Sequence, residues 1–314
     1  MRSARARLSI LALAAGLAWA GACGGGAETP SPQTARPERP VRIVPTNTAA
    51  AEFLATVLGP GAAARLAAIP EQVDAYSSLD FRVAPWSGIA RFARYEPEPM
   101  IALRPDLVVT HEWQSLDTTN VLRAQGIPVL VLASARGYED IRASIAELGK
   151  ALGAPEEAAR AIAGLDERIA RLAAGASARA GLRVLEYAND GTGGWTAGLE
   201  TTADAMIGLA GLRNAAAEAS IRGHARLEAE RLLAIDPDVL LVGSPARDET
   251  GSATKSVLEG VSEFATLAAV KGGRIVVLPA SLLSCDSPCL VDAAERLAAE
   301  IDRVLARAPT GPGR

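Results

Sequence analysis

Two histidines are the first side chains in the sequence that could do chemistry. His111 follows the apolar run LVVT and begins His111-Glu112-Trp113, whereas His224 follows Gly223 in the second half of the chain. No second histidine stands four residues after His111, so the paired-histidine pattern of zinc proteases is absent. Each histidine is therefore a candidate ligand contact or axial ligand to a metal centre, or a histidine that hydrogen-bonds a neighbouring carbonyl.

Two cysteines stand close together near the end of the chain. Cys285 and Cys289 enclose Asp286-Ser287-Pro288, directly before a run that predicts the last helix. Asp286 or Ser287 can cap that helix, and Pro288 suits its first turn. In an exported protein we expect a disulfide between the two cysteines, although a four-residue separation is short for the geometry of that bond. Two free thiols, or thiolates on a soft metal, are the alternatives.

Aromatic side chains gather in one stretch without strong periodicity, residues 69–98. Aromatics make up only 4% of the chain. The rings in this stretch are Tyr76, Phe81, Trp86, Phe92 and Tyr95. Flat rings provide large contact areas at small entropic cost, and ligands of α/β proteins bind at loops beyond strand ends. We predict Tyr76 and Trp86 as ligand contacts. Arg82 is predicted to face a ligand carboxylate or phosphate, and the alternative is that its side chain is solvated. The alternative is that rings such as Phe81 and Phe92 bury the loop against its own lobe.

Two further tryptophans follow predicted strands. Trp113 stands just beyond His111, and Trp195 lies in the glycine-rich run NDGTGGWTAG. That run has neither the lysine of a phosphate-binding P-loop nor the glycine spacing of a dinucleotide site. The simpler interpretation is a flexible turn that presents Trp195 to a ligand cleft. Trp113, Trp195 and both histidines complete the predicted ligand contacts.

A duplicated phrase positions these residues. EPMIALRPDLVV holds Glu98 eight residues before Asp106, and ERLLAIDPDVLL holds Glu230 eight residues before Asp238. Each phrase reads as a glutamate, a short amphipathic helix, a Pro-Asp turn and an apolar strand. Two exposed carboxylates at equivalent places can address a two-fold symmetric partner. The alternative is that both glutamates only favour the dipole of the helix they begin.

The duplication extends outward from these phrases. Each half opens with a strand and a helix and closes with a strand and a helix; the opening pairs are residues 41–44 with 49–58 and 182–187 with 202–212. Between the halves, residues 155–174 read as one long helix, because apolar residues recur at helical spacing after Pro155 and two glutamates, and Gly175 follows. We predict an α/β fold of two similar lobes with small central sheets, bridged by one long α-helix, with a ligand cleft between the lobes.

Composition excludes several classes of protein. The chain has 314 residues, 49% of them hydrophobic, which suits about two folded domains and excludes a disordered protein. Its formal net charge of −4 argues against nucleic acid as a partner. No Ser/His/Asp or Cys/His arrangement with supporting motifs is present, so we predict a binding protein and not an enzyme.

The N-terminus has the pattern of an export signal. Three arginines precede an apolar run, residues 8–20, that is too short to span a bilayer. The run ends in Ala20-Gly21-Ala22-Cys23, which is similar to the bacterial lipobox except that Ala20 stands where leucine is usual. We predict a lipoprotein signal peptide over residues 1–22, lipidated Cys23, and a flexible tether to residue 40. Ordinary signal cleavage near Ala22 is the alternative.

The order of these motifs resembles the bacterial substrate-binding lipoproteins of ABC importers for vitamin B12 (cobalamin), ferric siderophores and haem. The resemblance covers residues 41–307 and is carried by EPMIALRPDLVV, ERLLAIDPDVLL, the GTGGWTAG segment leading into ADAMIGLAGLRNAA, and RIVVLPA. It implies an N-terminal lobe (41–153), a rigid bridging helix (154–175), a C-terminal lobe (176–308) and a short tail (309–314). It also implies that Glu98 and Glu230 dock into arginine pockets on two permease subunits.

The resemblance also implies the ligand and the partners. A monomer without intrinsic cofactor, held at the extracytoplasmic face of a membrane through Cys23, would deliver a metal chelate to a permease dimer with its ATPase subunits. Trp86-Ser87-Gly88 is similar to a Trp-Gln-Gly segment of B12-binding members, although nine extra residues before Glu98 indicate a remodelled loop. Corrinoid and ferric siderophore rank ahead of haem. Haem would need an axial histidine or tyrosine, for which the candidates are His111, His224, Tyr76 and Tyr187. A membrane-tethered ligand sensor and a chelatase-like enzyme on the same two-lobed fold are the alternatives.

Overall fold

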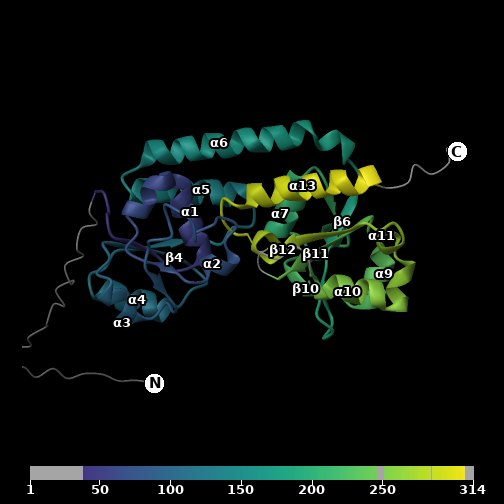
Figure 1. Cartoon of the computed structure of the whole chain (residues 1–314), viewed down its shortest axis with the longest axis horizontal. Helices are drawn as coiled ribbons and strands as arrows, with labels where there is room; N and C mark the ends of the chain where they lie inside the picture. The colour runs from purple at the N-terminus through teal and green to yellow at the C-terminus, as the bar shows by residue number, and fades with distance from the viewer. Residues whose placement is uncertain (1–37, 246–250, 284, 308–314) are drawn as a thin grey trace, which may run out of the picture. The chain divides into compact units, whose positions relative to one another are not determined.

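The computed structural model describes residues 38–245, 251–283 and 285–307, and Figure 1 shows how their helices and strands are arranged. The predicted signal peptide, Cys23 and the tail at 309–314 lie outside the described residues. Within the described ranges, no helix combines the length and the apolar character needed to cross a bilayer. The fold is α/β, with two lobes that each contain a small parallel sheet.

The first lobe is built on three parallel strands in the order β1-β4-β5. These are β1 (Ile43–Pro45), β4 (Leu107–His111) and β5 (Val129–Leu132). A two-stranded parallel pair, β2 (Ile69–Pro70) and β3 (Arg91–Phe92), lies beside them. The helices of this lobe are α1 (Thr48–Leu58), α2 (Val73–Tyr76), α3 (Pro97–Ala102), α4 (Leu116–Ala124) and α5 (Tyr138–Ala151), with a 3₁₀ turn at Gly59–Ala64.

Both faces of this small sheet are covered, which explains its continuous apolar strands. Leu107 and Val109 pack into the larger apolar cluster with α1 and α5. Val44 and Val108 point to the other face, where they pack with Met100 of α3. The core therefore sits on either side of the strands, and their carboxyl ends are left to carry polar side chains.

The second lobe repeats the plan with one more strand. Its parallel sheet has the order β12-β11-β6-β9, formed by β6 (Arg183–Glu186), β9 (Arg213–Asn214), β11 (Val239–Ser244) and β12 (Ile275–Pro279). Its helices are α7 (Thr202–Leu209), α8 (Ala215–Glu218), α9 (Ala229–Ile235), α10 (Ala253–Gly260), α11 (Ala268–Lys271), α12 (Ala280–Leu283) and α13 (Leu290–Arg307), with 3₁₀ turns at Ala176–Ala178 and Ser262–Thr266.

The interpretation of the glycine-rich run as a flexible turn is wrong for Trp195, which lies in a strand; residues 190–193 of the run join two strands. β7 (Ala188–Asn189) and β8 (Gly194–Ala197) form an antiparallel hairpin, and β10 (His224–Arg226) pairs with β8 on its other side. Gly194 is required at its place, because an added Cβ would lie 2.3 Å from the carbonyl oxygen of Leu227 and 2.4 Å from the Tyr187 ring. The glycines therefore allow close approach within a small sheet.

The duplicated Pro-Asp phrase has a common structural role. Asp106 accepts hydrogen bonds from the backbone N–H groups of Val41 (2.7 Å) and Arg42 (2.9 Å), at the start of the first strand of its lobe. Asp238 accepts the equivalent bond from the N–H of Arg183 at 2.9 Å. Each aspartate thus ties the strand that it precedes to the first strand of the same lobe.

The arginines of those first strands repeat the pattern at the neighbouring helix. The Arg42 guanidinium donates to the carbonyl groups of Leu103 and Arg104 beyond α3. The Arg183 guanidinium donates to the carbonyl groups of Ile235 and Asp236 at the end of α9. Because cations satisfy exposed carbonyl groups at helix C-termini, both arginines hold the short glutamate-bearing helices in equivalent positions.

The long helix α6 (Pro155–Ala174) has the bounds predicted from the sequence. Its buried residues are Ala158, Leu165 and Leu172, spaced by seven residues as on one helix face. α6 contacts α1 and α5 of the first lobe and α7 and α13 of the second, and Figure 1 shows it running along both. The predicted bridge between the lobes is therefore present, and α13 packs beside it as a second long helix.

Polar contacts join the two long helices. The Arg168 guanidinium of α6 donates to the carboxylates of Glu295, at 2.9 Å from Nε, and Asp292, both on α13. Arg179, just after α6, is almost fully buried and donates to the carbonyl group of Ala210 at 2.8 Å and to both oxygens of Asp302.

We expect Arg179→Ala to lower the free energy of unfolding by about 2 to 3 kcal/mol, because it leaves a buried carbonyl group and the Asp302 carboxylate without their donor. Urea unfolding measures the change. Arg171→Ala is the matched control: its exposed pair with Glu167 at 2.7 Å should contribute less than about 1 kcal/mol. Equal losses in the two variants would contradict the assigned role of Arg179.

Candidate functional site

A cavity of about 580 Å³ opens at the carboxyl ends of β1 and β4. Its walls come from the loop between β1 and α1, from α2, from the segment after β3, from the residues after β4, and from α12 with the loop that follows it. Both lobes therefore contribute, the first lobe more. The lining residues are Thr46, Asn47, Thr48, Ala49, Glu52, Gln72, Tyr76, Phe92, Ala93, Tyr95, Trp113, Gln114, Ala280, Ser281, Cys285 and Asp286.

The floor of the cavity is fixed by hydrogen bonds at the strand ends. Asn47 caps α1, since its Oδ1 accepts from the N–H of Ala50 at 2.9 Å. Thr46 Oγ1 donates to Thr110 Oγ1 at 2.8 Å, across the neighbouring strands β1 and β4. The carboxyl edge of a parallel sheet is the usual ligand edge of α/β proteins, and here hydrogen bonds link its neighbouring residues.

Four aromatic rings line the cavity. Tyr76 and Trp113 are each 55% exposed, whereas Phe92 and Tyr95 are partly buried. The Tyr95 hydroxyl hydrogen-bonds Thr119 Oγ1 at 3.0 Å, and burial raises its pKa. The structure therefore brings two of the predicted ligand contacts, Tyr76 and Trp113, to one cavity. Phe92, which could instead have been buried against its own lobe, also lines this cavity.

The buried His111 ring packs against the ring of Trp113. Its side chain is 1% exposed, and the two rings stack with centroids 5.8 Å apart. Asn47 Oδ1 already accepts a hydrogen bond, so its Nδ2 donates to His111 Nδ1 at 3.1 Å and the ring proton belongs on Nε2. Burial lowers the pKa of His111, against the opposing charges of Asp286 and Glu112. A neutral ring with Nδ1 occupied and Nε2 protonated is poorly arranged to ligate a metal.

Trp86 and Arg82 do not line this cavity. Trp86 packs on Phe81, with centroids 5.4 Å apart, and borders a separate hollow beside α1. Arg82 is exposed and pairs with Asp80 at 2.9 Å. The physical reason is Arg91, whose guanidinium donates to the carbonyl groups of Phe81 (2.8 Å) and Ile89 (2.5 Å) and folds the loop back on its own lobe.

The predicted contacts of the second lobe also lie elsewhere. Trp195 is 47% exposed on β8, with the Arg226 guanidinium 5.8 Å from its ring centroid. His224 is exposed on β10, paired across from Ala197. Tyr187 is buried and accepts a hydrogen bond from Asn189 Nδ2 at 3.0 Å. None of these three side chains is among the residues that line the cavity.

One wall of the cavity is acidic and carries thiols. The disulfide expected between Cys285 and Cys289 is not formed: both are buried free thiols. Ser287 lies between them and holds the loop, because its Oγ accepts from the N–H of Cys289 at 3.2 Å, contacts Cys285 Sγ at 3.6 Å and donates to Glu52 Oε2 at 2.5 Å. Hydrogen bonding within the loop replaces the covalent link.

Glu52 was missed from the sequence. It is the one charged residue within the apolar helix α1, TAAAEFLATVL, and it is 3% exposed. Its Oε1 accepts from Ser77 Oγ at 2.6 Å and from the N–H of Ser78 at 3.0 Å. Burial raises the pKa of Glu52, and the hydrogen bonds from Ser287, Ser77 and Ser78 oppose that shift. The sequence signal that could have identified Glu52 is a single acidic residue in an otherwise apolar helix.

Glu98 and Glu230 occupy equivalent places in the two lobes. Each is the second residue of its helix, α3 and α9, and each is exposed. Within the described ranges neither carboxylate forms an ion pair. In Figure 1 both helices lie away from α6.

Comparison with known proteins places the fold and the family. The chain is 28% identical over 207 residues to a cobalamin-binding protein of Halobacterium salinarum. The aligned region covers 64% of this chain and 54% of that protein. It is 25% identical over 210 residues to the uncharacterized ABC transporter substrate-binding lipoprotein YvrC of Bacillus subtilis, covering 65% of this chain and 64% of YvrC. The chain thus spans less than two thirds of the length of these curated relatives.

Solved structures share the fold over most of the chain. The periplasmic heme-binding protein RhuT of Roseiflexus sp. RS-1 has 25% identity and a TM-score of 0.70, covering 84% of this chain and 98% of RhuT. The vitamin B12 binding protein BtuF of Vibrio cholerae has 19% identity and a TM-score of 0.64, covering 86% and 100%, and shows likeness of fold alone. Residues 60–282 match the family described as periplasmic binding protein, and the chain belongs to that family.

Proposed function

We propose that the chain is the extracytoplasmic substrate-binding protein of an ABC importer, and that its cavity binds a corrinoid. The observation that carries the choice of ligand is the charge of the lining. Among the described residues, no lysine or arginine lines the cavity, whereas Glu52 and Asp286 do. The arginines that could have faced it are engaged elsewhere, Arg91 with Asp74 at 3.0 Å. An anionic ligand such as haem, with its propionates, would lack a countercharge here.

The polar lining suits a neutral ligand rich in amides. Asn47, Gln72 and Gln114 offer amide donors and acceptors, and Thr46 and Thr48 offer hydroxyl groups. The exposed rings of Tyr76 and Trp113 provide a flat apolar surface for a macrocycle. A corrin ring that carries neutral side-chain amides matches both features. A ferric siderophore with ionised carboxylates matches neither as well, and the cobalamin-binding relative supports the same choice.

The remaining parts of the proposal concern the setting of the protein. The family is one of binding proteins, so we assign no catalytic activity to this chain. Its partners would be a permease dimer and the ATPase subunits of that permease. The binding protein would dock on them as a monomer. Anchoring through lipidated Cys23, after removal of residues 1–22, would keep it at the membrane surface.

Ligand retention tests the proposal. The purified protein is mixed separately with cyanocobalamin, haemin and a ferric hydroxamate, freed of unbound ligand by gel filtration, and examined by absorption and mass spectrometry. We expect cobalamin to remain at one per chain. Trp113→Ala should weaken cobalamin binding about tenfold or more, because it removes a large exposed ring that contributes roughly 1.5 kcal/mol.

The matched control is Trp195→Ala. This tryptophan is exposed to a similar extent, at 47% against 55%, but does not line the cavity, so its loss should leave the affinity for cobalamin unchanged. Retention of haem in preference to cobalamin would overturn the assignment of the ligand. Retention of none of the three would overturn the assignment of a metal chelate altogether.

A further inference from the structure

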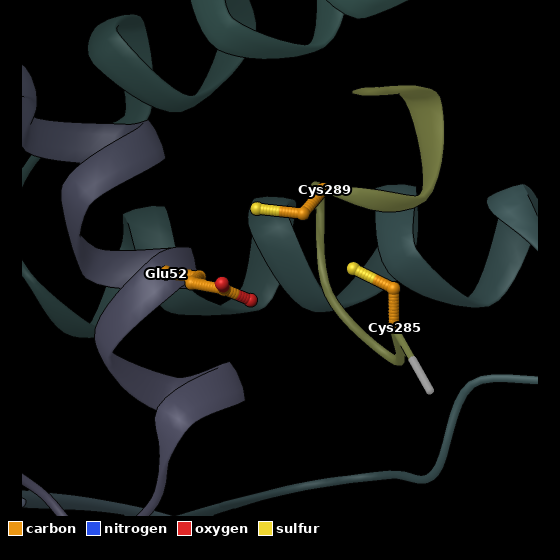
Figure 2. Close-up of side chains that lie close together, drawn as sticks. All are labelled: Glu52, Cys285 and Cys289. Carbon is orange, nitrogen blue, oxygen red and sulfur yellow. The ribbon is translucent and has the colours of Figure 1, made fainter. Parts of the chain in front are cut away.

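Three side chains with metal-binding atoms converge at the wall of the cavity. Glu52 comes from α1 of the first lobe, and Cys285 and Cys289 come from the loop before α13. A carboxylate oxygen and the two sulfur atoms all lie within 4.8 Å of one another. Figure 2 shows both thiols and the carboxylate pointing toward a common space. The three residues are 3%, 4% and 2% exposed, so the group is buried and not an acidic surface patch.

The donor set fits a borderline or soft divalent cation. Zn²⁺ is bound by thiolates at about 2.3 Å and carboxylate oxygens at about 2.0–2.2 Å, usually in a tetrahedron. Ligand atoms in such a tetrahedron lie roughly 3.5–3.8 Å apart. The three atoms here need to approach by no more than about 1.3 Å. Two sulfur ligands disfavour Mg²⁺ and Ca²⁺, which prefer oxygen.

The environment of Glu52 supplies the support that a ligating carboxylate needs. Its Oε1 is fixed by Ser77 and the N–H of Ser78, so the carboxylate is oriented independently of any ion. Its Oε2 accepts from Ser287 at 2.5 Å, and the Cys289 side chain also hydrogen-bonds this carboxylate. A cation at the common space would replace that hydroxyl group and compensate a carboxylate that no lysine or arginine of the described residues contacts.

The group also has an entry path. Glu52 and Cys285 both line the cavity, whereas Cys289 is not among its lining residues. An ion held by three protein atoms would therefore keep its fourth position toward the cavity, where water or a donor atom of a ligand could occupy it.

We propose that Glu52, Cys285 and Cys289 form a three-ligand binding site for a divalent cation of the Zn²⁺ class, with its fourth position open to the cavity. The site joins α1 of the first lobe to the loop before α13 of the second, so the bound ion links the two lobes at the cavity wall. It goes beyond the proposed importer function and does not depend on it, since the ion is bound by residues of this chain alone.

Metal titration tests the site. The full chain carrying Cys23→Ser, which leaves Cys285 and Cys289 as its two cysteines, is kept reduced and titrated with Zn²⁺ and, separately, Co²⁺, without any chelate. We expect one Zn²⁺ per chain and, with Co²⁺, thiolate-to-metal absorption in the near ultraviolet. Cys289→Ser and Glu52→Gln should each weaken Zn²⁺ binding at least tenfold, and Cys289→Ser should reduce the Co²⁺ band.

The matched control is Asp286→Asn. This carboxylate stands next to Cys285 and lines the same cavity but is not one of the three converging groups, so Zn²⁺ affinity should change less than threefold. Should a variant fail to fold, thiol alkylation of the Cys23→Ser protein with and without Zn²⁺ still tests the proposed site. A bound ion would protect both cysteines from alkylation.

Absence of stoichiometric Zn²⁺ binding, or alkylation rates that Zn²⁺ leaves unchanged, would overturn the site. Binding that is equal in all variants would also overturn it, since the ion would then lie elsewhere. Failure here is distinguishable from failure of the importer function, because cobalamin retention is measured without added metal and Zn²⁺ binding without cobalamin.

Discussion

Replacing both Glu98 and Glu230 with alanine is expected to abolish the stimulation of the importer's ATPase by this protein while leaving cobalamin retention unchanged. Both carboxylates are exposed, lie at the second position of equivalent helices and form no ion pair among the described residues. Each would pair with an arginine of one permease subunit. Truncating one partner of such a pair costs about 2 kcal/mol or more, so two together should weaken docking by at least about a hundredfold.

The measurement is ATP hydrolysis by the reconstituted transporter as a function of the concentration of the binding protein. Glu96→Ala with Glu228→Ala is the matched control, because these acids stand just before the same two helices, two residues earlier, and neither side chain makes a capping hydrogen bond. That control should stimulate ATPase activity like the unsubstituted protein. Full stimulation by the Glu98/Glu230 variant would remove the docking role, and the two glutamates would then only favour their helix dipoles.

Glu186→Gln is expected to stabilise the protein by about 2 kcal/mol at pH 8 and to have little effect near pH 4.5. Glu186 ends β6, its Oε2 is buried, and that atom has no hydrogen-bond partner among the described residues. Burial raises the pKa of Glu186 to about 7, from an ordinary value of 4.5.

The sign follows from the two protonation states. Below the ordinary pKa the side chain is neutral in both the folded and the unfolded chain, so it costs nothing. As the pH rises from the ordinary pKa of 4.5 toward the folded pKa of about 7, the unfolded chain ionises while the folded chain keeps its proton, so the folded state loses stability, with the full penalty above about pH 7. Glutamine removes the charge, although its amide keeps a desolvation cost, so the gain is smaller than the pKa shift alone would give.

Urea unfolding at pH 4.5, 6 and 8 measures the effect. Glu147→Gln, an exposed position on α5, is the control and should change the free energy of unfolding by less than about 0.5 kcal/mol at each pH. A stabilisation by Glu186→Gln that is the same at pH 4.5 and pH 8 would contradict the assigned ionisation.

Local sequence was enough to predict the long helix and the repetition of strands and helices in the two halves. The bounds of α6 were predictable because its start signal, apolar spacing and terminal glycine are all local. The duplicated phrase was predictable for the same reason, and the structure adds why Asp106 and Asp238 recur: each ties two strands of its own lobe. Both exposed glutamates follow from that repetition, since equivalent local sequences fold in equivalent ways.

Tertiary structure alone decided which side chains meet at the cavity. Tyr76 and Trp113 reach it, whereas Trp86 does not, because hydrogen bonds from Arg91 draw its loop toward the lobe. Trp195 was assigned to a turn because the glycines around it hide a strand, in which Trp195 pairs with Arg226 of β10, 31 residues away. Such cross-strand pairings leave little trace in local periodicity.

The convergence of Glu52 with Cys285 and Cys289 is the clearest case. Glu52 and Ser287, whose side chains hydrogen-bond, are 235 residues apart in the chain. The sequence shows an acid in an apolar helix and two cysteines near a helix start, and each observation has an ordinary local explanation. Only the packing of α1 against the loop before α13 brings them together, because side-chain proximity across two lobes depends on the whole fold and not on any spacing along the chain.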